Sequence, residues 1–404
     1  MMNLEASRSK EKVVSIDVIR GFALLGILLA NILFFKSPLF QKQGVIVPEP
    51  LGEAPFLEQT GHFVIEFFVN GKFYPMFSLL FGLGFYFFYS RIVQRGLDGN
   101  SFFKRRMTFL LILGLIHLVF IWSGDILHTY AVAGFFLLLF IDKTPKVILT
   151  WGIALLGVSW IVLSLLFILS SIALTMKGNA MGADIQNNIA AAYQVFSEGT
   201  YGEILAFRIQ EEVFYVLLNL FLTVPNVLGI FLIGLYFGKQ EWFTKAEEYQ
   251  KKWRNLFIHS FWSGVLLTSI YTFLLFDLFP IPYSLAISLA DGLNIIAGPL
   301  LMLCYVSFFV LLIQRIKSLK ALVPLAAVGR MALTNYLMQS VILVFIFYGF
   351  GFGLFGSVNI VESILIAIGI YLLQVVFSTL WLSKRSQGPM EALWRKWTYH
   401  QKEQ

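Results

Sequence analysis

The chain has 404 residues, of which 58% are hydrophobic and 13% are charged, and its mean hydropathy is +0.77. Charged residues make up roughly a quarter of an ordinary soluble domain, so this composition excludes that class and indicates a membrane protein. The formal net charge of +7 would suit a nucleic-acid-binding protein, but the positions of the basic residues argue against it.

Ten apolar runs follow one another along the chain, and most are long enough to cross a bilayer as a helix. We therefore expect an all-α fold, a polytopic membrane helix bundle of about ten transmembrane helices. It forms a single integral membrane domain over 1–404, with its core in 14–383 and a cytoplasmic interfacial segment in 384–404. The expected spans are 16–35, 63–89, 106–122, 126–141, 147–175, 213–238, 255–277, 284–313, 322–348 and 359–382.

The basic residues predict the orientation of these spans. With the N-terminus in the cytoplasm, the segments on the cytoplasmic side hold 23 of the 30 Lys and Arg residues, and only Lys36, Lys42 and Lys177 lie in outside connections. Cytoplasmic loops of membrane proteins carry such an excess of positive charge. We therefore expect a multi-pass protein of the cell (cytoplasmic) membrane with both termini inside. The partner of the basic surface is then the lipid bilayer and not nucleic acid.

The first two spans carry charged residues. In SIDVIRGFALLGILLANI, Asp17 and Arg20 lie three residues apart on one helical face. They form either a local ion pair at the membrane entrance, or a site where Arg20 faces a phosphate or carboxylate from the cytoplasm. Asn31 lies deeper, where it can hydrogen-bond to another helix. Lys72 lies near the outer end of the second span, so we expect its ammonium to snorkel toward the interface.

The third and fourth spans are joined within GLIHLVFIWSGDILHTYAVA, an apolar stretch that carries His117, Asp125 and His128. His117 lies ~16 Å from the inner end of its helix at 1.5 Å per residue. A tight turn brings the three side chains into one neighbourhood, and a histidine oriented by a carboxylate is the minimal general-base unit. The alternative is a buried histidine bonded to a carbonyl, with Asp125 acting only as the cap of the fourth helix.

No metal site is expected. His62, the other histidine on the extracytoplasmic side, is expected at a different depth from the pair above, which argues against a shared metal ion. The one cysteine, Cys304, lies inside an apolar run. It therefore excludes a disulfide framework and a Cys-based metal site within one chain.

Two later spans also contain polar residues. In VGRMALTNYLMQSVILVF, Arg330 lies ~12 Å along the predicted helix and needs a partner or a water-filled cavity, because a guanidinium stays charged. Asn335 and Gln339 are four residues apart and share a face of the same helix. In the sixth span, Pro225-Asn226 predicts a kink of the kind that lines a cavity.

Two segments outside the spans have amphipathic patterns. The outside connection 176–212 begins polar and becomes amphipathic over 207–212, which is typical of a helix lying at the membrane interface. The C-terminal GPMEALWRKWTY places two tryptophans beside Arg395 and Lys396. That pattern predicts a helix anchored on the inner leaflet.

Five motifs in this order resemble the YeiB-like family of bacterial membrane proteins. They are SIDVIRGFALLGILLANI, FSLLFGLGF, GLIHLVFIWSGDILHTYA, VGRMALTNYLMQS and GPMEALWRKWTY, and together they extend from about residue 14 to 399. The family is similar to transmembrane acyltransferases such as heparan-α-glucosaminide acetyltransferase and the O-antigen acetyltransferases. That similarity rests on the first-span pattern and on the intramembrane histidine.

The resemblance implies an acyl transfer across the membrane. Acetyl-CoA or another acyl-CoA would be the co-substrate on the cytoplasmic side, and a small-molecule, lipid or glycan acceptor would be acylated on the extracytoplasmic side. His117 and Asp125 would form the catalytic pair. Arg20, Asp17, Arg330, Asn335 and Gln339 would bind the donor. The further candidates are Asn31, His62, Lys72 and His128, and His62 competes with His117 for the catalytic role.

Two other functions remain open from the sequence. The same polar residues would suit a transporter or a protein that handles lipids or small molecules, with the residues lining a substrate or proton path. A sensor or accessory membrane subunit with a solid core is the third option. The sequence leaves the oligomeric state open, including a homo-oligomer.

Overall fold

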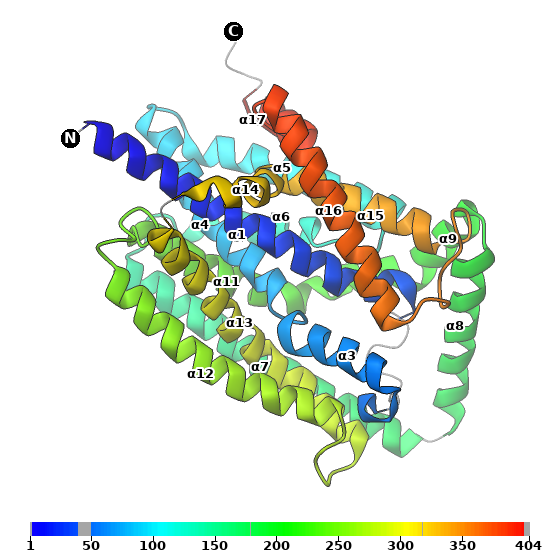
Figure 1. The fold of residues 1–404 in the computed structure, drawn as a ribbon. Coiled ribbons are helices and arrows are strands. Elements are labelled where there is room, and N and C mark those ends of the chain that lie inside the picture. Colours follow the sequence, from blue (N-terminus) through cyan, green and yellow to red (C-terminus); the bar gives the residue numbers. More distant parts are fainter. Residues whose placement is uncertain (1, 39–49, 178, 317, 400–404) are drawn as a thin grey trace.

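The computed structural model describes residues 2–38, 50–177, 179–316 and 318–399, and it describes their side chains except in 2–13 and 174–185. Every regular element in those ranges is a helix (Figure 1). Seven helical segments are long and apolar enough to cross a membrane, and one bent pair of helices makes an eighth in the described part of the chain. The expected all-α membrane bundle is therefore confirmed.

The bounds of the helices are as follows. The long apolar helices are α1 (Met2–Lys36), α3 (Phe56–Phe68) followed by α4 (Phe73–Gln94), α7 (Pro145–Lys177), α11 (Leu220–Lys239), α12 (Gln250–Leu275), α13 (Tyr283–Arg315), the bent pair α14 (Val323–Arg330) and α15 (Ala332–Phe347), and α16 (Ile360–Lys384). The others are η1 (Leu51–Glu53), α5 (Gly99–Ile116), η2 (His117–Ile121), α6 (Leu127–Leu137), η3 (Leu138–Phe140), α8 (Asn179–Glu198), α9 (Tyr201–Arg208), η4 (Ile209–Val213), α10 (Phe214–Leu218), η5 (Leu319–Leu322) and α17 (Pro389–Tyr399).

Each of the ten expected spans coincides with helix, but three of them are interrupted. The second breaks between α3 and α4, where Gly71 adopts a φ of +81° that a right-handed helix does not allow. The sixth is interrupted at Asn219, six residues before Pro225, which itself lies within α11. The ninth is bent by 72° between α14 and α15. A count of ten crossings therefore stays a prediction.

The centre of the bundle is α11, which packs against α4, α6 and α7. Its contact with α4 depends on two glycines. A Cβ on Gly82 would lie 2.0 Å from the Phe231 carbonyl oxygen, and a Cβ on Gly234 would lie 2.1 Å from that of Leu79. The two backbones therefore touch, which is how helices associate where lipid removes the hydrophobic driving force.

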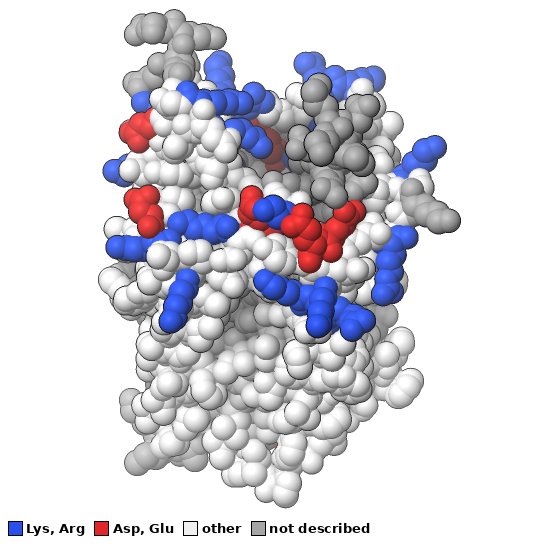
Figure 2. Space-filling view, turned by 90° about the vertical axis from the view of Figure 1, so that its left-hand side faces the viewer, with Lys and Arg blue, Asp and Glu red and all other residues white. Residues whose placement is uncertain are grey.

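Charge is unevenly distributed over the molecular surface. The starts of α1 and of α17 lie at the same end of the molecule, and α8 and α9 lie along an edge of the bundle toward the other end (Figure 1). On the face drawn in Figure 2, the charged side chains extend from the top to somewhat below the middle, and the lowest part is almost entirely uncharged. That uncharged surface suits contact with lipid.

Candidate functional site

The hairpin of α5 and α6 positions the central residues of the candidate site. After Ile116 the chain makes one wide turn, η2, and then becomes extended at Trp122, whose ring stacks on that of Phe35 with 4.2 Å between centroids. A Cβ on Gly114 would lie 2.3 Å from the backbone nitrogen of His128. The lack of a side chain at Gly114 thus lets the two helices touch, which brings the end of α5 beside the start of α6.

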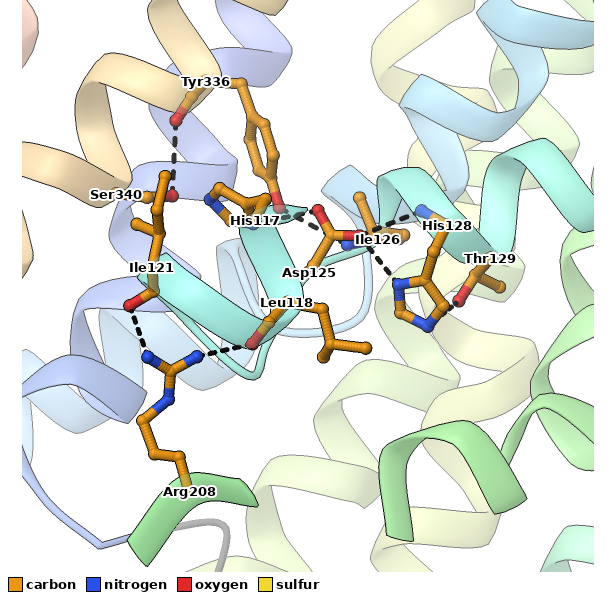
Figure 3. Close-up of polar contacts among 10 residues, drawn as sticks. All are labelled: His117, Leu118, Ile121, Asp125, Ile126, His128, Thr129, Arg208, Tyr336 and Ser340. Atoms are coloured by element: carbon orange, nitrogen blue, oxygen red, sulfur yellow. Dashed lines mark hydrogen bonds and ion pairs between the residues drawn. The ribbon is translucent and has the colours of Figure 1, made fainter. Parts of the chain in front are cut away.

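A single carboxylate joins the two histidines. Asp125 Oδ1 lies 3.0 Å from His117 Nδ1, and Asp125 Oδ2 lies 2.7 Å from His128 Nδ1. The backbone N–H of His128 also donates to Asp125 Oδ2 at 2.9 Å, so Asp125 caps the first turn of α6 as expected. All three side chains are buried, and Figure 3 shows the two rings on opposite sides of the carboxylate. The predicted neighbourhood of the three residues is therefore confirmed.

The outer nitrogens of the two rings have different surroundings. His128 Nε2 lies 3.3 Å from the hydroxyl oxygen of Thr129. His117 Nε2 is buried without a hydrogen-bond partner among the described residues, and the His117 ring packs beside that of Tyr336 at 5.4 Å between centroids. Only His128 is therefore linked through a hydroxyl to the cavity described next.

A cavity of about 690 Å³ adjoins this centre. Asp125 and Thr129 line it, whereas the two histidine rings lie behind them. Its walls come from α4, α7, α8, η4, α10, α11 and α13. Its other polar lining includes two carboxylates and three amides, namely Glu211, Glu212, Asn188, Asn219 and Asn226. The expectation that Pro225-Asn226 lines a cavity is confirmed for Asn226.

A buried ion pair between Arg208 and Glu212, which was not predicted from the sequence, contacts the turn between α5 and α6. The Arg208 guanidinium donates to the carbonyl oxygens of Leu118 and Ile121, the latter at 2.9 Å, and to Ser123 Oγ at 3.0 Å. Ser123 in turn donates to the Glu212 carboxylate, whose Oε2 lies 3.9 Å from Arg208 Nε (Figure 3 shows the contacts of Arg208 with the two carbonyls). The guanidinium therefore lies at the carbonyl end of a helix, where a positive charge is favoured.

The interfacial position expected for 207–212 stays a prediction, but two of its charged residues are not turned to water. Arg208 and Glu212 are only 1% and 4% exposed, so this segment does not simply lie on the interface with its charged face in water. The sequence feature that could have indicated this ion pair is the spacing of four residues between Arg208 and Glu212, which puts opposite charges on one helical face.

The residues expected to bind the donor do not line the cavity. Arg20 Nη1 lies 3.3 Å from Asp17 Oδ1, so the two form the local ion pair, and the Arg20 side chain remains 31% exposed. Arg330 was expected deep in a straight span. It is instead exposed at the end of α14, where the chain bends, and it donates to the Ser386 carbonyl at 2.9 Å. The bend removes the need for a buried partner.

Asn335 and Gln339 take part in hydrogen bonds between helices. The Asn335 amide donates to Val328 O and to Ser378 Oγ, and the Gln339 amide donates to Gln374 Oε1 at 2.8 Å. Gln374 then donates to the Asn335 carbonyl oxygen at 2.9 Å. Both side chains are buried, and these bonds link α15 to α16.

The remaining candidates are distributed over α1, α3 and the break before α4. Lys72 does not snorkel. It is completely buried, its ammonium donates to the Glu66 carbonyl oxygen at 2.7 Å, and it lies 5.1 Å from the centre of the Tyr271 ring. The break between α3 and α4 exposes that carbonyl as a partner. His62 on α3 and Asn31 on α1 are half-buried and do not line the cavity.

Metal binding has no support from geometry. In the part of the chain that the structure describes, no group of three or more His, Cys, Asp or Glu side chains is arranged to hold a metal ion.

Comparison with known proteins places the chain among full-length bacterial relatives. It is 32% identical to the uncharacterized protein YxaH of Bacillus subtilis (strain 168), over 99% of this chain and 97% of that protein. It is 29% identical to an uncharacterized 39.9 kDa protein in the amylase 3′ region of Bacillus acidopullulyticus, over 97% of this chain and 95% of that protein. It is also 29% identical to the uncharacterized protein YeiB of Escherichia coli (strain K12), over 96% of both chains.

A family model described as "Protein of unknown function (DUF418)" matches residues 237–401, which extend from the end of α11 beyond α17. No solved structure matches the chain significantly. The full-length identity and the family match agree with the motifs and with the helical fold. The chain belongs to the YeiB-like family of multi-spanning helical membrane proteins.

Proposed function

We propose that this protein is an acyltransferase of the cell membrane with both termini in the cytoplasm. It moves an acyl group from a cytoplasmic acyl-CoA, such as acetyl-CoA, to an acceptor bound in the 690 Å³ cavity. The observation that carries the proposal is Asp125, a residue in the wall of this cavity whose fully buried carboxylate contacts the imidazoles of His117 and His128. A carboxylate–imidazole pair beside a pocket is the arrangement that general-base catalysis requires.

The proton path follows from which ring nitrogens face Asp125. His128 is hydrogen-bonded to the carboxylate through Nδ1 at 2.7 Å, which favours the tautomer with the proton on Nδ1 and the lone pair on Nε2. His117 Nδ1 also lies near the carboxylate but forms no hydrogen bond with it. His128 Nε2 then accepts a proton from the acceptor through the Thr129 hydroxyl. The acceptor oxygen or nitrogen forms its bond to the acyl carbon, the carbon–sulfur bond of the donor breaks, and the proton passes to the departing thiolate.

In this proposal the two histidines have unequal roles. His128 relays the proton, because it is the ring linked to a cavity-lining hydroxyl. His117 contacts the other carboxylate oxygen and acts as a positioning residue for Asp125. Arg20 and Arg330 lie outside the cavity, and their partly exposed side chains suit the anionic parts of a donor at the cytoplasmic end.

The test is transfer of radiolabelled acetyl from acetyl-CoA to a panel of amines and hydroxyl compounds by the protein in nanodiscs. We expect Asp125→Asn and His128→Gln to lower the rate by about 10²–10⁴-fold, the usual contribution of a general base. His117→Gln should lower it less and shift its pH profile. His259→Gln, an exposed histidine on α12, is the matched control and should keep full activity.

Two results would refute the proposal. One is the absence of both label transfer and thermal stabilisation by millimolar acetyl-CoA. The other is full activity of His128→Gln together with Asp125→Asn.

A transporter is the second candidate, and a separate group of residues favours it. Lys72, in the break between α3 and α4, and Glu66, near the end of α3, are both buried, and the Glu66 carboxylate accepts hydrogen bonds from Asn70 and Tyr271. Ionisable residues buried within the membrane often mark proton paths. Proton-driven uptake of a solute by proteoliposomes, lost in Glu66→Gln, would support this function over acyl transfer.

A further inference from the structure

The charge of the cavity lining restricts what it can bind. Glu211 and Glu212 line it, together with Asp125, whose own carboxylate is fully buried, and no lysine or arginine among the described residues does so. Asp125 lies between two imidazoles, and Glu212 lies beside Arg208. Glu211 differs from both, because it is exposed at the cavity and forms no ion pair with a described residue. Its negative charge is therefore available to a ligand.

A buried amide in the cavity wall lacks a partner. Asn226 is only 5% exposed, and its Oδ1 accepts a hydrogen bond from the Tyr74 hydroxyl at 3.2 Å. Its Nδ2 is buried and has no hydrogen-bond partner among the described residues. Buried polar groups are almost always hydrogen-bonded, so an orphaned donor in a cavity wall indicates that a ligand oxygen accepts from it.

The remaining polar groups favour a ligand with several hydroxyls. Asn188 and Asn219 offer amides, and Thr129 and Thr223 offer hydroxyls, all along the same cavity. Amides and hydroxyls both donate and accept, as the hydroxyls of a polyol do. A volume of about 690 Å³ has room for a ligand much larger than a single alcohol.

We propose that the cavity binds a polyhydroxylated molecule that carries an ammonium group, and that it discriminates against the anionic equivalent. The ammonium pairs with Glu211, and a hydroxyl oxygen accepts from Asn226 Nδ2. The inference rests on the proposed function in treating this ligand as the acyl acceptor. The ammonium nitrogen, once it loses a proton, or a neighbouring hydroxyl would then be the group that is acylated.

The test compares three open-chain polyols that differ only at one end: glucamine, sorbitol and gluconate. Their binding to the full chain in nanodiscs is measured near neutral pH by calorimetry, with no acyl donor present. We expect glucamine to bind roughly five- to tenfold more tightly than sorbitol, the scale of a partly exposed charge pair. Gluconate should bind more weakly than both.

Two variants assign the contacts. Glu211→Gln should remove the preference for glucamine over sorbitol, whereas Glu53→Gln, an exposed carboxylate outside the cavity, should keep it. Asn226→Leu should weaken the binding of all three ligands. The unfolding temperature of this variant shows whether it is still folded. Because Glu211 is on the surface, its variant tests the proposal even if Asn226→Leu does not fold.

Several results would overturn the inference: gluconate binding as tightly as glucamine, an unchanged preference in Glu211→Gln, or no binding of any of the three. Acetyl transfer to an uncharged or anionic acceptor would leave the proposed function intact while refuting this ligand class. Conversely, selective binding of glucamine with neither acetyl transfer nor thermal stabilisation by acetyl-CoA would retain the ligand class and refute the acyltransferase.

Discussion

At the scale of single residues, loss of the Arg208 side chain should destabilise the fold strongly. It is fully buried and donates to two carbonyls and to Ser123, and it lies beside the buried Glu212. Removing one partner of a buried pair leaves an uncompensated charge and costs about 3–5 kcal/mol. We expect Arg208→Met to lower the free energy of unfolding by about that amount, measured by thermal unfolding of the protein in detergent.

The double variant Arg208→Met, Glu212→Gln separates charge from packing. It should recover part of the stability, because the carboxylate that lost its partner is then neutral. Wild-type stability of Arg208→Met alone would contradict this account of the site.

The same residues show how far sequence could predict the site. His117, Asp125 and His128 lie within one hairpin, so helix geometry and a tight turn were enough to bring them together. Arg208 is about ninety positions further along the chain. Its partners are backbone carbonyls of η2, and a carbonyl leaves no signal in the sequence. The contact was therefore beyond prediction, although the i,i+4 spacing of Arg208 and Glu212 was visible.

At the scale of elements, α17 is fixed to the bundle by polar and ring contacts. The Glu391 carboxylate accepts from the backbone N–H groups of Leu333 and Thr334, at 2.8 and 3.1 Å, and from the Thr334 hydroxyl. It thus satisfies the free N–H groups at the start of α15. The Trp394 indole lies 3.6 Å from the Arg106 guanidinium, while Trp397 is 47% exposed. One face of α17 therefore binds the bundle, and an apolar residue remains free to contact lipid.

Replacing Glu391 should loosen the junction of α15 and α17. We expect Glu391→Gln to cost about 1 kcal/mol, the usual value of a helix cap and its favourable charge. Hydrogen–deuterium exchange should rise at the start of α15 and in α17, and remain unchanged at the centre of α11. Glu248→Gln, an exposed carboxylate in another part of the chain, is the control. Equal exchange in the two variants would show that Glu391 does not hold the junction.

Helix interruptions illustrate what apolar periodicity cannot predict. All ten runs are helical, because composition and length decide that much. The bend lies at Met331, directly after Arg330, whose helix propensity is ordinary. It is favoured by partners from elsewhere, namely Glu391 at the start of α15 and the Ser386 carbonyl at Arg330. Reading 322–348 as one straight helix therefore placed Arg330 in the membrane, whereas the bend leaves it exposed.

At the scale of the whole molecule, the positions of the basic residues predict the orientation in the membrane. Ser386 and Ser357 are exposed near opposite ends of α16, whose 25 residues span ~37 Å at 1.5 Å per residue, enough to cross the hydrocarbon core. The Ser386 end carries α17 and its basic residues, so positive charge assigns it to the cytoplasm.

Cysteine labelling of intact cells tests this orientation. We expect a membrane-impermeant maleimide to label Ser357→Cys in intact cells, and to label Ser386→Cys only after the membrane is made permeable. The unmodified chain is a built-in control, because its single cysteine, Cys304, is 5% exposed and lies inside α13. The reverse labelling pattern would show that the protein has the opposite orientation in the membrane. It would also place Arg20 and the exposed Arg330 outside the cell, away from any cytoplasmic acyl-CoA, and so remove the donor side of the proposed reaction.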